Sequence, residues 1–442
     1  MRDLLITGGT LIVPRKSDET RLFAVSTDLA VRDDTILMVG ERGELPGDFD
    51  PDVTVDAGGC AVIAGLVNAH CHAAMSLLRG YADDMPLMQW LQEKVFPAEA
   101  ELVPSDIYWG TALAVVEMLQ GGVTSFSDMY FHMCETAQAA ADLGIRATLS
   151  VGMAGQQRNE DSLQQACEFH QQWHGTENDR IRVQLGPHAP YTCSPEFLSE
   201  VAALAEKLGC GVHMHLAETQ DEVDTITQEY GVSPIQYVVQ TGLTAQKPFT
   251  AAHCVHLKEN DLALLKREGV RVAHCPQSNQ KLGSGTAPLS SILDEGVMVG
   301  LGTDGACSTA KLDVWSEMQA ASLQQKVLNH NPSLIPAGQA LYLATRGGAL
   351  AIGREDTGQL VPGFKADIAV VDLNSPHLQP VNDLITILGY CAGPRDVRDV
   401  FVDGHWLVRD GKLTVFDQDE VVTNAKKCSA DLIKRVNKNA DG

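Results

Sequence analysis

Histidines spaced two residues apart occur twice in the chain, each time at the end of an apolar run. The pairs are His70 with His72, and His213 with His215. In a β-strand, residues i and i+2 point to the same face, so each pair can direct both imidazoles toward one point. Neutral imidazole is a common zinc ligand. Each pair alone also fits buried, hydrogen-bonded histidines, so the spacing indicates candidate metal ligands only.

Two carboxylates and a third histidine cluster follow similar runs. Glu218 lies three residues after His215, where its carboxylate could reach over a metal and move protons. Asp304 follows an apolar run and is flanked by glycines, which is typical of a catalytic residue at the top of a barrel and also of an ordinary turn aspartate. His253 and His256 form the third cluster. Three imidazoles and one carboxylate could bind one divalent cation and leave a position for water.

The middle of the chain, which carries these residues, alternates short apolar runs with amphipathic stretches. The stretches 105–120, 194–208 and 312–327 are typical of helices. The runs that predict strands are 62–69, 123–127, 146–151, 181–185, 211–215, 250–253, 271–274 and 297–303. Continuous strands alternating with helices indicate a parallel sheet with helices outside. Eight such strands favour a (β/α)8 barrel, although a doubly wound open sheet gives similar local patterns.

Both ends of the chain read as short strands separated by turns. The first 60 residues carry alternating or continuous β-branched residues, and the segment from 366 to 413 looks similar, with Asp-Gly turns at 403–404 and 410–411. We therefore expect a composite β-sandwich domain from residues 1–60 and 360–420. The barrel is expected over 61–359, and a helical tail over 421–442.

Composition excludes several classes of protein. The 442 residues include 57 acidic and 33 basic side chains, a formal charge of −24. So acidic a chain lacks the basic footprint of a nucleic-acid binder and would be repelled by anionic membranes. The 11 cysteines contain no Cys-x-x-Cys pair, which favours reduced thiols. We expect no signal peptide, no transmembrane helix and a cytoplasmic location.

One motif points to a different chemistry. The segment from Gly300 to Gly305 fits Gly-x-Gly-x-x-Gly after an apolar run, the form of a dinucleotide-binding fingerprint. It begins about 300 residues into the chain, whereas the fingerprint belongs to the first βα turn of a doubly wound domain. A nicotinamide-dependent oxidoreductase is therefore the weaker alternative. A non-catalytic binding protein on the same barrel is another.

The segments GLVNAHCHAAMSLLRG, HMHLAET, AAHCVHL, HCPQSNQKLGSG and LGTDGACS together resemble the amidohydrolase superfamily. The resemblance implies a distorted (β/α)8 barrel that holds one divalent metal, most often Zn²⁺, with Fe²⁺ or Mn²⁺ as alternatives. The positions that match its metal ligands are His70, His72, His215 and Asp304. Glu218 and His253 match its proton-handling positions, with Asp304 sharing the catalytic work. The match passes over His213 and assigns no role to His256, which we expect to be structural.

Within that superfamily, the chain most resembles the 5′-methylthioadenosine/S-adenosylhomocysteine deaminases. The resemblance implies that Trp90 covers the nucleoside, Glu99 binds the ribose hydroxyls and His188 contacts the purine, with Glu218 also touching the ring. Without it, Trp90 reads as a core residue and Glu99 as a solvated acid at a helix start. The implied reaction is hydrolytic: water adds at C6 of the adenine ring, Glu218 protonates the neighbouring ring nitrogen, and ammonia leaves. The expected partner is a small purine nucleoside, and the resemblance suggests a homo-oligomer.

One departure from that family bears on the substrate. Members that accept S-adenosylhomocysteine are expected to hold its carboxylate with arginines after the third strand, where this chain has Val151 and Ser162. Arg158 lies in the same loop at a position that does not match. The departure favours the uncharged methylthio substrate, with adenosine or S-adenosylhomocysteine as alternatives. A further alternative is a deaminase or hydrolase of another aminated ring, such as guanine, 8-oxoguanine or a chlorotriazine.

Overall fold

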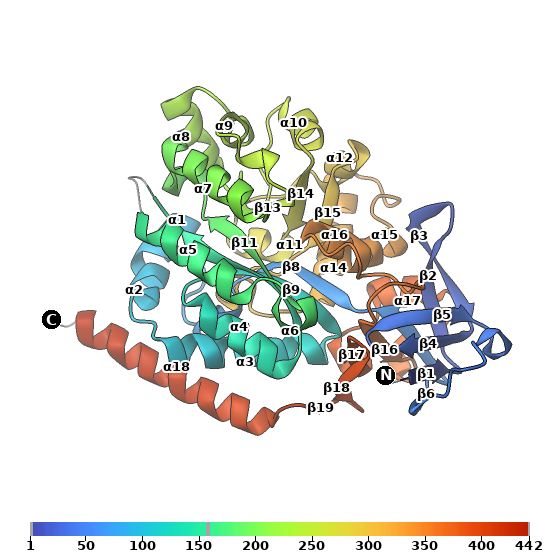
Figure 1. The fold of residues 1–442 in the computed structure, drawn as a ribbon. Coiled ribbons are helices and arrows are strands. Elements are labelled where there is room, and N and C mark those ends of the chain that lie inside the picture. Colours follow the sequence, from blue (N-terminus) through green and yellow to red (C-terminus); the bar gives the residue numbers. More distant parts are fainter. Residues whose placement is uncertain (1–2, 156–159, 441–442) are drawn as a thin grey trace.

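A parallel barrel of eight strands forms the middle of the protein. The computed structural model describes residues 3–155 and 160–440. The strands are hydrogen-bonded in the order of the sequence, and Figure 1 shows them enclosed by helices. They are β8 (Leu66–Cys71), β9 (Val123–Tyr130), β10 (Arg146–Met153), β11 (Ile181–Pro187), β12 (Val212–Leu216), β13 (Phe249–His253), β14 (Val270–His274) and β15 (Met298–Leu301). The predicted (β/α)8 barrel is confirmed.

Burial on both faces explains why these segments form strands of a barrel. All eight residues of β9 and all five of β12 are buried, as expected for parallel strands covered by helices on one side and filled on the other. The helices that follow the strands include α3 (Pro104–Gln120), α4 (Met133–Leu143), α5 (Glu160–Trp173), α7 (Pro195–Leu208), α8 (Gln220–Tyr230), α10 (Asp261–Arg267), α12 (Leu289–Asp294) and α14 (Val314–Leu328). The helices predicted over 105–120, 194–208 and 312–327 are therefore present.

The barrel is closed between β8 and β15 by loop and side-chain contacts. The ladder of strand pairs has β8 and β15 at its two ends. Across the seam, the Asp304 amide donates to the His70 carbonyl at 3.0 Å, and the Thr303 amide donates to Asn68 Oδ1 at 2.9 Å. Gly302 permits this approach, because a Cβ there would lie 2.8 Å from the His70 nitrogen. The closure therefore places Asp304 beside the first histidine pair.

The first predicted barrel strand, over 62–69, is wrong at its start. That apolar run is two strands, β7 (Cys60–Ala64) and β8, and β7 pairs with strands of the terminal domain. The chain changes sheets at Gly65, where a Cβ would lie 2.1 Å from Thr124 Oγ1. A continuous hydrophobic run conceals this break, because both strands are buried. By strand pairing, the first domain boundary would lie at Gly65 rather than between residues 60 and 61. The other domain boundaries stay predictions.

Strands from both chain ends form a second, smaller β domain, as predicted (Figure 1). One sheet has four strands in the order β5–β4–β1–β6, and the other has seven in the order β19–β18–β17–β16–β7–β2–β3. The amino-terminal strands are β1 (Asp3–Thr7), β2 (Thr10–Arg15), β3 (Asp18–Ser26), β4 (Asp28–Arg32), β5 (Thr35–Gly40) and β6 (Val53–Asp56). The carboxyl-terminal strands are β16 (Ile368–Asp372), β17 (Val397–Val402), β18 (His405–Arg409) and β19 (Lys412–Leu413).

The chain ends in a long helix, α18 (Gln418–Ala440), which runs along the outside of the barrel in Figure 1. Arg435 pairs with Asp106 at the start of α3 and donates to the Glu101 carbonyl at 2.9 Å. Ser429 donates to the Leu77 carbonyl at 2.8 Å. The expected helical tail is therefore docked on the barrel, and its helix starts slightly earlier than position 421.

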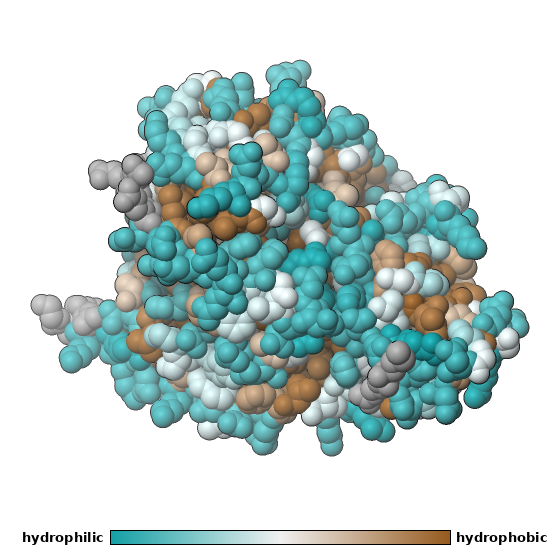
Figure 2. Space-filling model, in the orientation of Figure 1, coloured by the Kyte–Doolittle hydropathy of each residue, from teal (hydrophilic) through white to brown (hydrophobic). Residues whose placement is uncertain are grey.

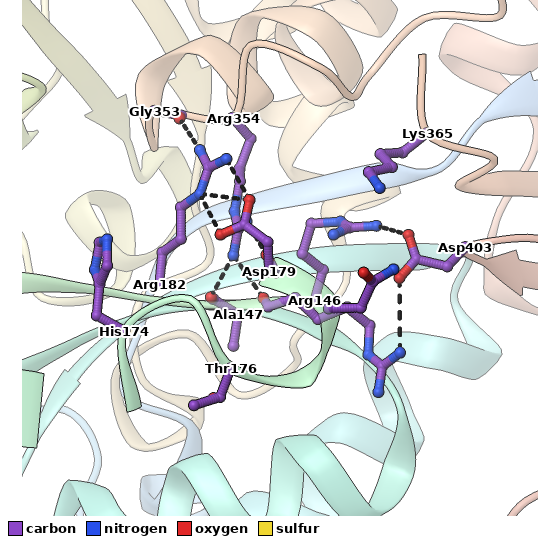
Figure 3. A network of polar contacts seen from close by, with 12 residues as sticks. Arg146, Ala147, His174, Thr176, Asp179, Arg182, Gly353, Arg354, Lys365 and Asp403 are labelled. Atoms are coloured by element: carbon purple, nitrogen blue, oxygen red, sulfur yellow. Dashed lines mark hydrogen bonds and ion pairs between the residues drawn. The ribbon is translucent and has the colours of Figure 1, made fainter. Parts of the chain in front are cut away.

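A buried polar network joins the barrel to the terminal domain (Figure 3). Arg146, the first residue of β10, donates to both carboxylate oxygens of Asp367 at 2.8 and 2.9 Å and also pairs with Asp403. Next to it, the buried Arg354 guanidinium donates to the carbonyls of Ala147 and Arg180 at 2.8 and 2.5 Å. These contacts lie at the amino-terminal ends of the barrel strands, because Arg146 begins its strand.

Hydrophilic residues cover most of the molecular face drawn in Figure 2, with apolar residues in small patches. Within residues 3–155 and 160–440, no helix is both long and apolar enough to cross a membrane. Each of the 11 cysteines is a free thiol in the described part of the chain. The observation agrees with the expected reduced thiols.

Candidate active site

The structure brings the four predicted metal ligands together at the carboxyl-terminal ends of the barrel strands. Asp304 Oδ1 lies 3.5 Å from His70 Nε2 and 3.2 Å from His72 Nε2. His215 Nε2, at the end of β12, lies 3.2 Å from His72 Nε2. Donor atoms of His70, His72 and Asp304 all fall within 4.8 Å of one another. Side chains more than 230 residues apart thus share one point at the barrel top.

Each of the three imidazoles is held by its other ring nitrogen. His72 Nδ1 lies 2.6 Å from the Met129 carbonyl, and His215 Nδ1 lies 2.9 Å from the His188 carbonyl. Because a carbonyl only accepts, both Nδ1 atoms carry a proton, and both Nε2 atoms face inward. His70 Nδ1 instead meets His213 Nε2 at 2.9 Å. His213, which the family match passed over, therefore orients His70 from behind.

The chemistry of this donor set fits a divalent cation. His70 Nε2 is fully buried and has no hydrogen-bond partner in the described part of the chain, a state that a metal would relieve. Burial lowers the pKa of His70 to about 4 and holds that of His215 well below its usual value, so both are neutral. Burial opposes ionisation of Asp304, yet contact with His70 and His72 keeps its pKa well below the usual range. Burial disfavours protonation of His72, yet its hydrogen bond with Asp304 raises its pKa to about 9, so a bound cation would take the place of its Nε2 proton. Imidazole nitrogens around an ionised carboxylate are typical zinc ligands.

Asp304 is fixed by its neighbours and by its backbone. Its φ is +65°, a left-handed conformation that costs energy for a residue with a Cβ and clusters at functional sites. Oδ2 accepts hydrogen bonds from Ser278 Oγ at 2.5 Å and Ser308 Oγ at 3.0 Å, and Oδ1 accepts from the Gly305 amide at 2.8 Å. Ser278 and Ser308 were not predicted. The residue type alone gives no signal for such small polar side chains.

The two predicted proton-handling residues lie on the rim of the same cluster. His253 Nε2 is 3.8 Å from Glu218 Oε2, and both side chains are buried. Burial raises the pKa of Glu218 above its usual value, which favours a carboxyl that can hold a proton. His253 Nδ1 contacts Asn279 Oδ1 at 2.9 Å, an interaction that fixes its ring. Asn279 also escaped prediction.

The segment that carries Glu218 is anchored by a second buried glutamate. Glu222, on α8, accepts hydrogen bonds from the amides of Ala217 and Glu218 at 2.8 and 2.9 Å. Ala217 itself has a φ of +53°, so the backbone turns sharply just before Glu218. The turn explains how a residue three positions beyond His215 still points over the same site. Glu222 is a further residue that the sequence reasoning missed.

A cavity of about 180 Å³ opens above the cluster. Its inner end carries His72, His215, Glu218, His253 and Asp304. Its outer part is lined mainly by apolar side chains, including Leu87, Leu91, Phe96, Phe131 and Met153. A small ring system with a short apolar extension fits such a pocket, which is mainly apolar and carries ionisable groups at its inner end.

The three residues assigned to substrate by resemblance all line this cavity. Trp90 ends the short helix α1 (Leu87–Trp90) and is buried, with its Nε1 donating to the Ala82 carbonyl at 3.1 Å. Glu99 ends α2 (Phe96–Glu99). His188 follows β11, and its Nδ1 lies 3.0 Å from Thr192 Oγ1. Glu99 is thus turned toward the cavity, contrary to the reading as a solvated acid.

Burial in the cavity wall raises the pKa of Glu99 to about 6, although Tyr130 and His72 act in the opposite direction. Tyr130 is itself buried and lines the cavity beside Glu99. This tyrosine was not predicted. Its position at the end of β9, the strand next to β8, was the available signal, because residues at that edge meet at the barrel top.

The wall expected to bind the far end of the substrate is uncharged. Gly152, Met153 and Ala154, which follow Val151 along β10, line the cavity, and the lining contains no lysine or arginine from the described residues. Ser162 lies on α5. Arg158 lies outside the described residues.

The glycine motif at 300–305 has a structural explanation. Its first residues end β15 of the barrel rather than the first strand of a doubly wound sheet. Gly302 allows close approach to His70, and a Cβ at Gly305 would lie 2.6 Å from Met75 Sδ. The barrel therefore contradicts the dinucleotide-fold alternative, since the glycines pack against the metal-ligand strand.

Comparison with known proteins agrees with this fold. Residues 61–407 match the Amidohydrolase family, and the chain belongs to that family. Among its relatives, the 5-methylthioadenosine/S-adenosylhomocysteine deaminase of Desulforudis audaxviator is 47% identical over 92% of this chain and 95% of its own. The protein of the same name from Pelotomaculum thermopropionicum is 44% identical over 98% of this chain and 100% of its own.

A solved structure gives the same result at the level of the fold. An adenosine deaminase from Xanthomonas campestris, with bound zinc, superimposes with a TM-score of 0.92. It is 33% identical, and the match covers 98% of this chain and 99% of that one. The similarity thus extends over both the barrel and the terminal domain.

Proposed function

We propose that this protein is a metal-dependent hydrolytic deaminase that converts 5′-methylthioadenosine to the 6-oxo nucleoside and ammonia. The observation that carries the proposal is the convergence of His70, His72, His215 and Asp304, with Glu218 beside them, at the closed end of an apolar cavity. The relatives named as 5-methylthioadenosine/S-adenosylhomocysteine deaminases support the reaction class.

The same four side chains would hold the metal, with Zn²⁺ the first candidate and Fe²⁺ or Mn²⁺ the alternatives. When bound, such an ion supplies a Lewis acid that lowers the pKa of water toward neutrality. The inward Nε2 atoms of the histidines and the ionised Asp304 carboxylate are the donors for it. The zinc in the adenosine deaminase structure supports the choice of metal.

Glu218, His253 and Asp304 would handle the protons. Glu218, with a raised pKa and a place in the cavity lining, donates to the ring nitrogen beside C6 and makes that carbon more electrophilic. Asp304, with His253 nearby, takes the proton of the attacking water. Glu218, now ionised, then takes the proton of the new C6 hydroxyl and relays it to the amino group, which leaves as ammonia, and the proton held by Asp304 restores the starting charge of the pair. General acid–base catalysis of this kind contributes about 10²–10⁴-fold.

The cavity wall supports a neutral thioether nucleoside. Glu99 would accept from the ribose hydroxyls, Trp90 would cover the nucleoside, and His188 would contact the purine. An apolar outer wall suits a methylthio group, and the missing cations at Val151 and Ser162 leave a carboxylate without a counter-charge. A substrate without ribose, such as guanine, would leave Glu99 without its partner, so the alternative has less support.

A substrate comparison tests this proposal. Side-by-side kcat/KM values on metal-analysed protein should rank 5′-methylthioadenosine first, adenosine second and S-adenosylhomocysteine third, with guanine and a chlorotriazine inactive. Preference for S-adenosylhomocysteine would contradict the argument from Val151 and Ser162. Turnover of guanine alone would contradict the nucleoside assignment. The cytoplasmic location and the homo-oligomer stay predictions.

A further inference from the structure

His256 has no role in the family resemblance or in the proposed mechanism. It lies between two segments that meet at Glu218. Its backbone amide donates to the Ala217 carbonyl at 2.9 Å, one residue before Glu218. Its ring Nε2 lies 2.5 Å from the Ser284 carbonyl. A carbonyl only accepts, so Nε2 carries the proton and donates. The ring is partly buried and thus shielded from competing water.

The segment on the far side of this contact reaches the carboxyl group of Glu218. Ser284 is buried, and its Oγ donates to Glu218 Oε1 at 3.4 Å. The distance is long for a hydrogen bond, as catalytic hydrogen bonds often are before substrate binds. The backbone of Glu218 is already held by Glu222. Ser284 is thus the hydroxyl that limits rotation of the carboxyl group.

The packing of the next residue shows that this approach is tight. Gly285 has a φ of +125°, a conformation that side chains rarely adopt, and a Cβ there would lie 3.0 Å from Val255 Cγ1 and 3.2 Å from His256 Nε2. Val255 also donates its amide to the Ala217 carbonyl at 2.9 Å. Three segments, around residues 217, 255 and 284, are therefore locked together beside Glu218, with His256 contacting both of the others.

We propose that His256 is a positioning residue for the deamination: it holds the Ser284 loop against the Ala217–Glu218 backbone so that the Ser284 hydroxyl aims the Glu218 carboxyl at the substrate. The inference rests on the proposed function. His256 lines no part of the cavity and acts only through Ser284. A general proton donor placed at the wrong angle loses turnover more than binding, because the lost interaction is made in the transition state.

The test compares two amides at position 256. His256→Gln places an amide NH₂ near the position of Nε2, whereas His256→Asn places it near Nδ1, out of reach of Ser284. We expect His256→Asn to lower kcat on 5′-methylthioadenosine about tenfold with KM within about twofold, an effect in the range of lost orienting contacts. His256→Gln should recover most of that loss. His330→Asn, on the exposed surface, is the matched control.

Ser284→Ala, a smaller change, keeps the test decisive if the His256 variants fold poorly. It should lower kcat by a similar factor, and the double variant should lose no more than about tenfold, because both changes break the same chain of contacts. Metal content and thermal unfolding should match the wild type. Additive losses of about a hundredfold, or a His256→Asn variant with wild-type kcat, would overturn the proposal.

Failure of the proposed function would look different. A wild-type protein that releases no ammonia from any of the nucleosides would overturn the deaminase assignment and with it the catalytic purpose of the contact. Crystal structures of the wild type and of His256→Asn would then test whether His256 positions the Ser284 loop. A displaced Ser284 loop and a rotated Glu218 side chain in the variant support it, and an unchanged loop contradicts it.

Discussion

Two clusters of buried ionisable groups lie at opposite ends of the barrel strands, and they are built in opposite ways. At the amino-terminal ends, the Arg146 guanidinium meets the carboxylates of Asp367 and Asp403, so donors face acceptors. At the carboxyl-terminal ends, the Nε2 atoms of His70 and His72 converge with a carboxylate oxygen of Asp304, so three possible metal donors face one point. In the first cluster the positive charge of Arg146 is paired with carboxylates of the same chain, whereas the second cluster calls for a cation.

The surroundings of the two clusters differ as well. The Arg146 cluster joins two domains and lines neither the cavity above Asp304 nor the small pocket around Ile12 and Gln359. The Asp304 cluster forms the floor of the former. Active sites of barrel enzymes lie at the carboxyl-terminal face, and contacts at the other face serve stability. Burial of charge alone therefore does not mark function. Metal-binding donor atoms that face one point below an open cavity do mark it.

The largest expected effect comes from removing the carboxylate at the centre of the Asp304 cluster. Asp304→Ala should abolish ammonia release and lose the metal, because it removes one ligand and the acceptor for the water proton. Metal analysis and a turnover assay measure both losses. Asp294→Ala, on the exposed end of α12, is the control. Full activity in Asp304→Ala would break the contrast between the two clusters.

Glu218→Gln should lower kcat by about 10²–10⁴-fold while the metal stays bound, because the variant keeps the shape of the side chain and loses the proton. Turnover and metal content measured on one preparation separate catalysis from binding. The exposed Glu196→Gln should behave as wild type. Wild-type turnover in metal-loaded Glu218→Gln would remove Glu218 from the mechanism.

In the Arg146 cluster, Arg146→Met should lower the free energy of unfolding by about 3–5 kcal/mol, because two buried carboxylates lose their counter-charge. Denaturant unfolding measures this loss, and the folded fraction should keep its kcat and metal. Lys434→Met, in an exposed pair with Asp431, should change stability by less than about 1 kcal/mol. A stable Arg146→Met protein that had lost its catalysis would reverse the assignment of the two clusters.

The smallest effect concerns the cavity wall. Glu99 has a pKa near 6, and only its ionised form accepts from two ribose hydroxyls. Protonation below pH 6 should therefore raise KM for 5′-methylthioadenosine, by about tenfold between pH 7 and pH 5 for a single group. Glu99→Gln should have a KM that is flat over this range. An identical pH dependence in the variant would show that another group causes it.

The strands and their order could be predicted from sequence because buried parallel strands are continuous apolar runs. Each of the eight predicted runs overlaps one barrel strand. The break at Gly65 could not be predicted, because β7 and β8 are both fully buried and differ in the strands with which they pair. Residue patterns report burial, whereas the choice of sheet depends on partners far away in the chain.

The site shows the same limit. Spacing alone could not choose between His213 and His215, since both are buried on β12, and only the family resemblance selected His215. The structure places His215 near His72 and His213 behind His70, but the assigned roles stay predictions. Trp90 and Glu99 also depended on the resemblance, because their helices lie far from any strand end in sequence.

The residues that sequence reasoning missed act through other side chains. Ser278, Asn279 and Ser284 follow β14 and contact Asp304, His253 and Glu218 in turn. Small polar residues in a loop are common in any protein, so their types carry no signal. Their position after the seventh barrel strand does, because that loop borders the site in three dimensions.

We expect the donor atoms of His70, His72, His215 and Asp304 to hold one divalent ion that is used for hydrolysis. The direct measurement is metal content together with ammonia release from 5′-methylthioadenosine, before chelation, after it and after reloading with Zn²⁺. We expect about one ion per chain, loss of turnover on chelation and recovery on reloading, with no effect of added NAD. Full turnover by metal-free protein would contradict it.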